Sequence, residues 1–363
     1  MKINLAIDAR PLSLQPTGIG RYTEEILSRL QTQVDCSLFS DKNIITQLKN
    51  VRLYPFSGAH IPRRLKKSVL WQQLLLPKTL RQSRCDLFWS PRHHLPLLGC
   101  KKVPMVLTIH DLVYRKMPET MKRSNWILEK LLLAASVKRA DHVIAISQAT
   151  RQSLIEELKT PEHKISVIHS GYFQIPAVSA QARAKPYILF LGTLEPRKNI
   201  ERLVDAYLGL PQYLQDEYDL VLAGGRGWKS ETLFSKIATS PHINALGFVN
   251  DIEAATLLRN ATCFAFPSLY EGFGLPILEA MAAGTPVLTS NDPACVEVSG
   301  DAALHVDSLS VESISHHLQT LLEDAHLRQS LVQKGFENIK RFSWDTAAAA
   351  HLKVFQGIKI LID

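Results

Sequence analysis

The segment 267–287 joins a glycine-rich loop to a helical pattern and carries two carboxylates, Glu271 and Glu279. Gly272 and Gly274 let a ligand come close to the backbone, and the first turn of a helix offers unpaired N–H groups to an anion such as phosphate. Carboxylates accept hydrogen bonds from sugar and ribose hydroxyls. Each carboxylate alone could be a surface charge or a favourable partner of the helix dipole. Together they predict a site for a nucleotide sugar laid across the helix end.

Two adjacent cations, Arg197 and Lys198, stand in the sequence GTLEPRKN at 192–199. They follow an apolar run closely, and the carboxyl ends of strands are where open α/β sheets bind ligands. Such a pair can hold a diphosphate and stabilise the charge that develops on it as it leaves. An Arg-Lys pair is also common on solvated surfaces, so it points to a site mainly because the carboxylate loop is present as well.

The N-terminal half has a phosphate-tolerant turn of its own, TGIGRY at 17–22, in which Gly18 and Gly20 follow the first strand and open the first helix. The turn differs from the dinucleotide-binding pattern, because Thr23 stands where the third glycine belongs. We also find no acidic residue that closes a credible second strand about twenty residues further on. A nicotinamide or flavin dehydrogenase is therefore poorly supported.

His110, followed by Asp111, ends the apolar run 103–109, and catalytic residues gather at such strand ends. A histidine there could contact a sugar hydroxyl or relay a proton, or it could equally be a structural residue bonded to backbone. His93 and His94 give a similar but weaker signal. The chain has no D-x-D sequence, the usual carboxylate handle for a divalent ion on a nucleotide diphosphate. We therefore expect no metal and no cofactor, with the cations neutralising the diphosphate instead.

Short β-branched runs alternate with longer amphipathic stretches, a pattern that predicts two α/β halves, each a parallel sheet covered by helices. We expect strands at 3–7, 86–89, 103–109, 142–146, 165–168, 187–191, 220–223, 263–266 and 287–289. We expect helices at 21–31, 65–76, 125–136, 148–158, 199–208, 277–283 and 343–361. The predicted domains are Rossmann-like and cover residues 1–173 and 186–345, with an aperiodic linker at 174–185.

The composition is that of a folded protein whose charge is unevenly divided. The chain has 363 residues, of which 46% are hydrophobic and 21% charged. Residues 1–185 hold 29 Lys and Arg against 13 Asp and Glu (+16), whereas residues 186–363 hold 13 against 21 (−8). The basic half suggests an anionic partner, nucleic acid or a phospholipid surface, although uneven solvation would give the same count. Five scattered cysteines favour a reducing, cytoplasmic setting, and no apolar run is long enough for a signal peptide or a membrane span.

Together these motifs resemble glycosyltransferase family 4, which comprises retaining enzymes of the GT-B fold. The resemblance runs from residue 3 to the sequence FSW at 342–344. Within the family, the sequence most closely resembles the bacterial mannosyltransferases of polysaccharide and O-antigen assembly. It is carried by the spacing of Glu271 and Glu279, GTLEPRKN, LVLAGGRG at 220–227, the turn Gly247-Phe248-Val249, His110-Asp111 and TGIGRY.

The resemblance implies two Rossmann-like domains facing each other across a cleft, an N-terminal acceptor domain and a C-terminal donor domain. It also implies that the last helix, 346–363, crosses back to complete the N-terminal domain. By resemblance Arg197 and Lys198 bind the donor diphosphate, Glu271 holds the hydroxyls of the transferred sugar and Glu279 binds the ribose. The remaining donor contacts are assigned to Gly18 and Gly20 near the diphosphate, His110 at the sugar, Phe273, Gly274 and Leu275 beside Glu271, and Gly247, Phe248 and Val249 around the base.

The implied reaction is metal-independent transfer with retention, in which the leaving phosphate helps to deprotonate the acceptor hydroxyl on the same face. The resemblance favours GDP-mannose as donor, although a UDP-sugar donor and a nucleotide-sugar epimerase or hydrolase of related fold stay open. A glycoside hydrolase using Glu271 and Glu279 would leave Arg197 and Lys198 without a role. A nucleic-acid-binding protein lacks support, because no basic motif is interleaved with aromatic residues.

The basic half also contains a candidate membrane surface. Four cations, Arg63, Arg64, Lys66 and Lys67, precede Trp71 and a run of leucines. Such a stretch can lie in a lipid interface with its cations on anionic head groups, or its apolar residues can pack on the domain core. Relatives by resemblance extend lipid-linked glycans, so we expect a peripheral enzyme at the inner face of the cytoplasmic membrane.

Overall fold

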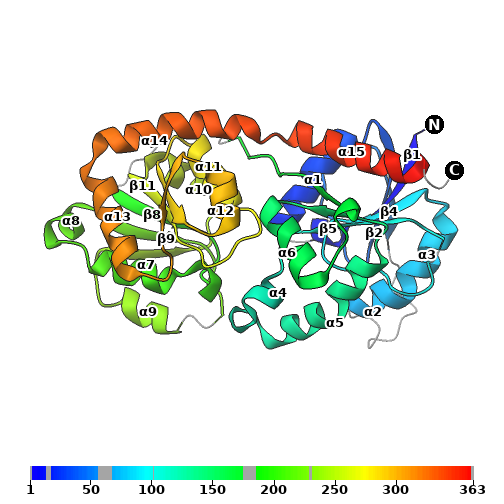
Figure 1. The fold of residues 1–363 in the computed structure, drawn as a ribbon, viewed down its shortest axis with the longest axis horizontal. Helices are drawn as coiled ribbons and strands as arrows, with labels where there is room; N and C mark the ends of the chain where they lie inside the picture. Colours follow the sequence, from blue (N-terminus) through cyan, green and yellow to red (C-terminus); the bar gives the residue numbers. More distant parts are fainter. Residues whose placement is uncertain are drawn as a thin grey trace. The chain divides into compact units, whose positions relative to one another are not determined.

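The computed structural model describes residues 2–13, 18–55, 68–100, 102–174, 185–228 and 231–360. The chain divides into two units, each built on its own sheet (Figure 1). The N-terminal unit comprises Met1–Tyr114, Arg123–Gly171 and Ser343–Asp363, and the C-terminal unit comprises Arg115–Lys122 and Tyr172–Phe342. Two Rossmann-like α/β units confirm the predicted fold class.

The N-terminal unit has a seven-stranded sheet whose strands pair in parallel in the order β3-β2-β1-β4-β5-β6-β7. The chain leaves β1 on one side through β2 and β3 and returns on the other side as β4. The carboxyl ends of β1 and β4 therefore form the switch point of the sheet, where open α/β sheets bind ligands. The strands are β1 (Ile3–Asp8), β2 (Val34–Ser40), β3 (Val51–Pro55), β4 (Leu87–Ser90), β5 (Met105–Ile109), β6 (His142–Ala145) and β7 (Ile165–Val167).

Helices cover this sheet, and the last helix of the chain is among them. In Figure 1, α15 (Trp344–Ile360) lies along α1 (Gly18–Leu30), and the two helices are in contact. The other helices of the unit are α2 (Ser68–Leu70), α3 (Leu76–Ser83), α5 (Arg123–Arg139) and α6 (Gln148–Leu158). A π-helical turn at Trp71–Leu75 joins α2 to α3, and α4 (Val113–Lys116) spans the boundary between the units.

A buried polar network fixes α15 to this unit. The side chain of His351 on α15 is fully buried, and its Nδ1 donates to the carbonyl of Ala347 at 2.7 Å. Its Nε2 must then accept the hydrogen bond from the hydroxyl of Tyr22 on α1, at 2.6 Å. Phe355, also fully buried, packs against Trp89 of β4. The last helix is therefore a part of the N-terminal core.

The C-terminal unit repeats the same plan with six strands in the order β10-β9-β8-β11-β12-β13, also parallel. Its switch point lies between β8 and β11. The strands are β8 (Tyr187–Leu191), β9 (Asp219–Ala223), β10 (Ile243–Gly247), β11 (Cys263–Phe266), β12 (Val287–Ser290) and β13 (Ala303–Val306). The helices are α7 (Ile200–Leu208), α8 (Gln212–Glu217), α9 (Glu231–Ile237), α10 (Asp251–Asn260), α11 (Leu275–Ala282), α12 (Pro293–Ser299), α13 (Val311–Glu323) and α14 (Ala325–Asn338).

Four strands are absent from the sequence prediction: β2, β3, β10 and β13. Three of them are sheet edges, where one side has no neighbouring strand and fewer apolar residues are required. In β2 the polar residues Asp35 and Ser37 interrupt the apolar run. Asp41 follows β2 directly, so the expectation that no acidic residue closes a second strand was wrong. Helices α4, α8, α9, α10, α12, α13 and α14 were likewise not predicted, and α3 shares only Leu76 with the expected helix 65–76.

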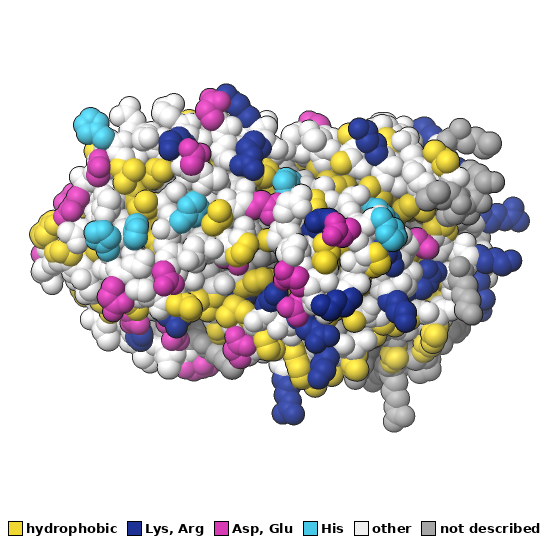
Figure 2. Space-filling model, viewed as in Figure 1, with side chains coloured by type: hydrophobic (Ala, Val, Ile, Leu, Met, Phe, Trp, Pro, Cys, Tyr) yellow, Lys and Arg dark blue, Asp and Glu magenta, His cyan; other side chains and the backbone are white. Residues whose placement is uncertain are grey.

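The surface reflects the uneven charge. On the face drawn in Figure 2, Lys and Arg side chains are concentrated over the elements of the N-terminal unit. All five cysteines are free thiols. Among the described residues, no helix is long and apolar enough to cross a membrane.

Candidate functional site

A buried ion cluster lies at the switch point of the C-terminal unit. Arg197 and Lys198 stand in a short 3-10 turn after β8, and Glu271 stands in the loop after β11. The carboxylate of Glu271 receives Arg197 Nη1 at 2.8 Å and Lys198 Nζ at 2.6 Å, one on each oxygen. Glu195 takes Arg197 Nη2 at 2.9 Å. The residues predicted from two separate motifs therefore meet in one cluster.

The two loops that carry this cluster are joined by backbone contacts. Asn199 adopts a left-handed conformation with φ 61°, and its Nδ2 donates to the carbonyls of Pro267 at 3.0 Å and Ser308 at 2.6 Å. The amide of Leu269 donates to the carbonyl of Arg197 at 2.9 Å. These bonds hold the cations and the carboxylate in register without any ligand.

The turn after β9 explains the glycines of the LVLAGGRG motif. A Cβ on Gly224 would lie 1.9 Å from the carbonyl oxygen of Gly192, and one on Gly227 would lie 2.3 Å from that of Leu194. The backbone of this turn therefore packs directly on the turn that leads to Arg197. A side chain at either glycine would displace the cation loop.

The cluster keeps its carboxylate ionised. Burial alone would raise the pKa of Glu271, but Arg197 and Lys198 outweigh it and lower the pKa to about 2. Burial lowers the pKa of Lys198, and Glu271 opposes that effect in part. A lowered pKa favours the anionic form of Glu271, whereas the acid of a glycoside hydrolase needs a raised pKa, so the cluster suits that alternative poorly.

A further buried carboxylate, Asp292, lies beside Glu271. It caps α12 by accepting the backbone N–H groups of Ala294 at 3.0 Å and Cys295 at 3.4 Å. Burial, and then the charge of Glu271, raise the pKa of Asp292 to about 6. Asp292 was missed from the sequence, although a carboxylate just after a strand end is the signal that would have found it.

The helix that follows the loop begins and ends as predicted. Gly274 caps α11 with φ 111°, a proline follows within the first turn, and Gly284 ends the helix with φ 76°. Phe273 is buried, whereas Leu275 and Glu279 are half-buried, with Glu279 in the second turn.

The residues that the sequence analysis assigned to the base lie at and just after the end of β10. Gly247 closes that strand in a left-handed conformation with φ 74°, and the side chain of Phe248 is 72% exposed. Val249 is half-buried. An exposed aromatic ring at this edge is available to a nucleobase.

In the N-terminal unit, His110 follows β5 and has a defined tautomer. Its Nε2 lies 2.8 Å from the carbonyl of Pro91, so it carries the proton, and Nδ1 is left as an acceptor. Burial, and then the neighbouring His93, lower the pKa of His110 to about 4. The backbone N–H of His110 donates to His93 Nε2 at 3.1 Å. His110 thus bonds to backbone and still presents a neutral imidazole nitrogen that can accept a hydroxyl proton.

His93 and His94 share the carboxylate of Glu129 on α5. Oε2 of Glu129 lies 3.4 Å from His93 Nδ1 and 3.3 Å from His94 Nε2. Burial would raise the pKa of Glu129, but the charge of His93 and bonds to both rings lower it overall. Within the described ranges no group of three or more His, Cys, Asp or Glu side chains is arranged to hold a metal.

The glycines expected near the diphosphate lie at the start of α1, whereas the segment expected to contact the membrane lies partly in the core. Gly18 and Gly20 stand in the first turn of α1, and a Cβ on Gly18 would meet no atom within 4 Å. Trp71 is only 4% exposed and packs under the guanidinium of Arg10 at 5.2 Å, so its expected role in a lipid interface was wrong. The hydrophobic effect buries its large ring in the core. The four cations at 63, 64, 66 and 67 lie outside the described residues.

Models of two protein families match the chain in succession. Residues 16–172 match "Glycosyltransferase Family 4", and residues 173–338 match "Glycosyl transferases group 1". Among curated proteins, O-antigen chain mannosyltransferase B of Escherichia coli is 31% identical over 384 residues, which cover 98% of this chain and 100% of that protein. O-antigen chain mannosyltransferase RfbU of Salmonella typhimurium is 26% identical over 259 residues, or 69% of this chain and 70% of that protein.

Solved structures share the fold at low identity. The Anabaena protein HepE, crystallised with UDP and glucose, superposes with a TM-score of 0.76 at 18% identity, covering 98% of this chain and 99% of that one. WaaG, a glycosyltransferase involved in lipopolysaccharide biosynthesis, gives a TM-score of 0.75 at 16% identity, covering 97% and 100%.

Proposed function

The chain belongs to the glycosyltransferases of group 1 and family 4, and from that premise we propose that it transfers a mannosyl unit from GDP-mannose to a hydroxyl of a growing glycan. The observation that carries the proposal is the buried cluster of Arg197, Lys198 and Glu271 at the C-terminal switch point. Mannose is supported by the names of the relatives, which are O-antigen mannosyltransferases.

The cluster suits a leaving diphosphate. An ammonium group has three donors, and Lys198 Nζ makes one hydrogen bond among the described residues, to Glu271. Lys198 therefore has donors left for phosphate oxygens, and the guanidinium of Arg197 lies on the other oxygen of the same carboxylate. Two cations aimed at the charge that develops on the leaving group supply catalysis by electrostatic stabilisation.

Glu271 has a separate role in the proposal. The negative charge of Glu271 orients both cations. The lone pairs of its carboxylate that the cations do not use accept hydrogen bonds from sugar hydroxyls. His110 Nδ1, a neutral acceptor in the N-terminal unit, suits contact with a hydroxyl of the transferred sugar. We assign the ribose to Glu279, which is half-buried in the second turn of α11, and the base to the exposed ring of Phe248. The sugar is transferred with retention, and the leaving phosphate takes the proton of the acceptor hydroxyl.

The experiment is a transfer assay with GDP-mannose, UDP-glucose and UDP-galactose in parallel, with purified O-antigen precursors as acceptors. Product from GDP-mannose alone supports the proposal, and product from a UDP-sugar alone refutes the donor assignment. Turnover of the nucleotide sugar with no acceptor present would instead indicate an epimerase or hydrolase. Thermal shifts with GDP, UDP and ADP rank the bases independently of the acceptor, since a ligand at a hundred times its Kd stabilises by about 2.7 kcal/mol.

Metal independence belongs to the same proposal, because Arg197 and Lys198 can neutralise a diphosphate without a divalent ion. Transfer should survive excess EDTA. Loss of activity on chelation, with recovery on adding magnesium or manganese, would contradict it.

We further propose that the acceptor is lipid-linked and that the enzyme works at the inner face of the cytoplasmic membrane. Leu131 and Ile127 lie one turn apart on α5 and are 68% and 43% exposed, and the exposed cations Arg123 and Lys130 flank them. Exposed apolar side chains beside cations suit an anionic lipid surface, where each basic residue contributes about 1 kcal/mol.

Vesicle flotation tests this surface. Wild-type protein should float with vesicles containing phosphatidylglycerol at low salt and be released by high salt. Replacing Leu131 and Ile127 by Ser, or the four cations at 63, 64, 66 and 67 by Gln, should reduce flotation. The exposed Leu309→Ser variant in the C-terminal unit serves as control. Absence of wild-type binding would make a soluble acceptor the better assignment.

A further inference from the structure

The switch point of the N-terminal unit holds an arginine, Arg92, whose guanidinium forms no ion pair or hydrogen bond with the described residues. Arg92 stands two residues after β4. The segments outside them contain no Asp or Glu other than Asp363. The side chain is half-buried, and burial together with the neighbouring Arg10 lowers its pKa, although the charges of Asp8, Glu129 and Asp41 oppose this in part.

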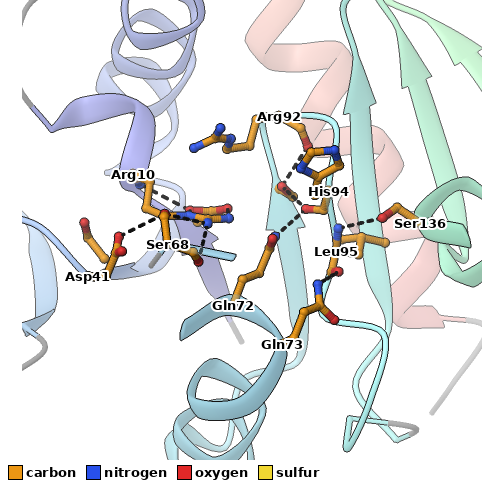
Figure 3. Close-up of polar contacts among 12 residues, drawn as sticks. Arg10, Asp41, Ser68, Gln72, Gln73, Arg92, His94, Leu95 and Ser136 are labelled. Atoms are coloured by element: carbon orange, nitrogen blue, oxygen red, sulfur yellow. Dashed lines mark hydrogen bonds and ion pairs between the residues drawn. The ribbon is translucent and has the colours of Figure 1, made fainter. Parts of the chain in front are cut away.

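Nearby carboxylates are engaged elsewhere. Both oxygens of Asp8 are taken by Arg10, whose Nε lies at 2.8 Å and Nη2 at 2.5 Å. Arg10 Nη1 in turn bonds Ser68, at 3.1 Å to its carbonyl and 3.0 Å to its hydroxyl. Asp41 lies within 3.4 Å of the hydroxyl of Ser68 (Figure 3). Glu129 faces the two histidines described above. Since a partly buried charge without a partner is costly, its retention calls for a ligand.

The loop that carries Arg92 is rigid. The hydroxyl of Ser90 lies 2.8 Å from the carbonyl of Arg92 and 2.9 Å from that of His94, so its single proton is shared between the two. The π-helical turn aims two consecutive amides at the same loop: Gln72 bonds the carbonyl of His94 at 2.7 Å, and Gln73 bonds that of Leu95 at 2.9 Å. Figure 3 shows Arg92 extending from this braced loop toward the region of Arg10. The backbone under Arg92 is therefore preorganised, as binding sites require.

The C-terminal unit offers an internal precedent. Its ion cluster lies at the carboxyl ends of β8 and β11, the two strands that flank its switch point. Arg92 and Asp8 lie at the carboxyl ends of β4 and β1, which flank the switch point of the N-terminal sheet. The same place in each sheet thus carries a buried pair of opposite charges, Asp8 with Arg10 in the N-terminal unit and Glu271 with its two cations in the C-terminal unit. The N-terminal unit adds Arg92, whose guanidinium has no ion pair among the described residues.

We propose that Arg92 is the anion-binding residue of the acceptor site, where its guanidinium pairs with an oxyanion, a phosphate or a carboxylate, carried by the acceptor. A planar guanidinium matches the two oxygens of such a group. The proposal rests on the proposed function, since only a transferase requires an acceptor. Arg10 is a positioning residue here, because the hydrogen bonds of its guanidinium among the described residues go to Asp8 and Ser68.

The first test measures anion binding without turnover. Inorganic pyrophosphate and citrate are titrated by calorimetry into an Arg197→Ala/Lys198→Ala protein, which lacks the donor-side cations. Binding should persist there and fall about 10- to 100-fold when Arg92→Gln is added, since a charge-assisted pair contributes that much. Arg52→Gln, an exposed arginine of the same unit, should change nothing. No binding before Arg92 is altered, or equal binding after, overturns the proposal.

The second test measures stability. Removal of an unpartnered, partly buried charge should leave the melting temperature of Arg92→Gln equal to or above that of the wild type. A fall of several degrees would show that the arginine has a structural partner and would overturn the proposal.

The third test uses the acceptor. Matched glycans that are neutral, phosphorylated or carboxylated are compared as acceptors. Wild type should favour one acidic form, which also identifies the source of the oxyanion, and Arg92→Gln should raise the KM for that acceptor about tenfold or more with the donor KM unchanged. Equal use of all three by wild type, or equal losses in the variant, overturns the proposal. If no acceptor is glycosylated at all, the proposed function fails, and the calorimetric test still decides whether Arg92 binds anions.

Discussion

The two switch points of this glycosyltransferase treat buried charge in opposite ways. In the C-terminal unit, Arg197 and Lys198 share the carboxylate of Glu271, so opposite charges are matched before any ligand arrives. In the N-terminal unit, Asp8 is paired with Arg10, but the nearby Arg92 forms no ion pair among the described residues, and His110 stays neutral. The first arrangement depends on complementary ions and the second on keeping imidazole uncharged. The two units should therefore fail under different perturbations, deletion of charge in one and acid in the other.

The largest expected effect is loss of the C-terminal cations. Arg197→Ala and Lys198→Ala should each lower kcat/KM by at least a hundredfold, since a well-placed donor to developing charge is worth about 3 kcal/mol. Circular dichroism and melting curves should show that each variant is folded. Lys340→Ala removes an exposed ion pair and should leave turnover intact. Near wild-type rates in both variants would remove the ionic cluster from the mechanism.

Acid should act first on the N-terminal unit. Burial lowers the pKa of His351 to about 4, below its unfolded value of about 6.5. Stability from the neutral ring is complete above pH 6.5 and is lost as the pH falls toward 4, because the unfolded chain then binds more protons. The loss should reach about 3 kcal/mol, and His110 adds to the same slope.

Unfolding by denaturant at pH 7 and pH 4.5 measures this slope. Tryptophan fluorescence of a Trp228→Phe background follows the N-terminal unit, because the other four tryptophans belong to it. His351→Gln should flatten it, whereas the exposed His163→Gln should not. An unchanged slope in the first variant would show that the acid sensitivity arises elsewhere.

Exchange of the shared carboxylate separates binding from transfer. Glu271→Gln should lower the transfer rate by about 30-fold, the roughly 2 kcal/mol of a charged hydrogen bond. GDP affinity should stay equal or increase, because both cations are released toward the diphosphate. Glu279→Ala should instead weaken GDP binding. Equal losses of GDP affinity in the two variants, measured by calorimetry, would contradict this division of roles.

The smallest expected effect is that of Asp292 on stability, and its pH dependence is opposite to that of His351. The pKa of Asp292 is raised to about 6, so its ionisation destabilises the C-terminal unit as the pH rises from about 4 through 6. Asp292→Asn keeps a capping side chain and should stabilise that unit by about 1 kcal/mol at pH 7.5 but not at pH 4.5. Melting curves at the two pH values measure the difference. Destabilisation at pH 7.5 would mean that the charged cap outweighs repulsion from Glu271.

The sequence prediction was accurate for central strands, which are buried on both faces, and for one helix, α6, that is only partly buried. The expected strands 187–191 and 263–266 and the expected helix 148–158 coincide with β8, β11 and α6. Central parallel strands are continuous apolar runs with sharp ends, so their first and last residues can be predicted from the sequence. Edge strands such as β3 and β13 lack that signal because one side has no neighbouring strand.

The sequence predicted which residues belong to the site better than it predicted which of them form ion pairs with one another. Arg197, Lys198 and Glu271 were each predicted, but their mutual ion pairs join residues more than seventy positions apart and depend on how β8 and β11 adjoin. Trp71 shows the same limit in reverse, since an aromatic residue beside cations suits a lipid surface or a core equally well. Arg92 has no local motif at all, and only the topology of the sheet gives its position meaning.

The return of α15 to the N-terminal unit sets the order in which a ribosome can complete the two units. By the time Gly171 is made, all seven strands of the first sheet exist, but the helix that packs on α1 and Trp89 does not. The chain must first be extended through the whole C-terminal unit to Ser343, which takes roughly 10–35 s at about 5–20 residues per second. Throughout that interval the hydroxyl of Tyr22 lacks His351, and the apolar face of α1 lacks its cover. The unit that is begun first is therefore finished last. During this interval the exposed apolar face of α1 is the surface of the nascent N-terminal unit that chaperones would cover.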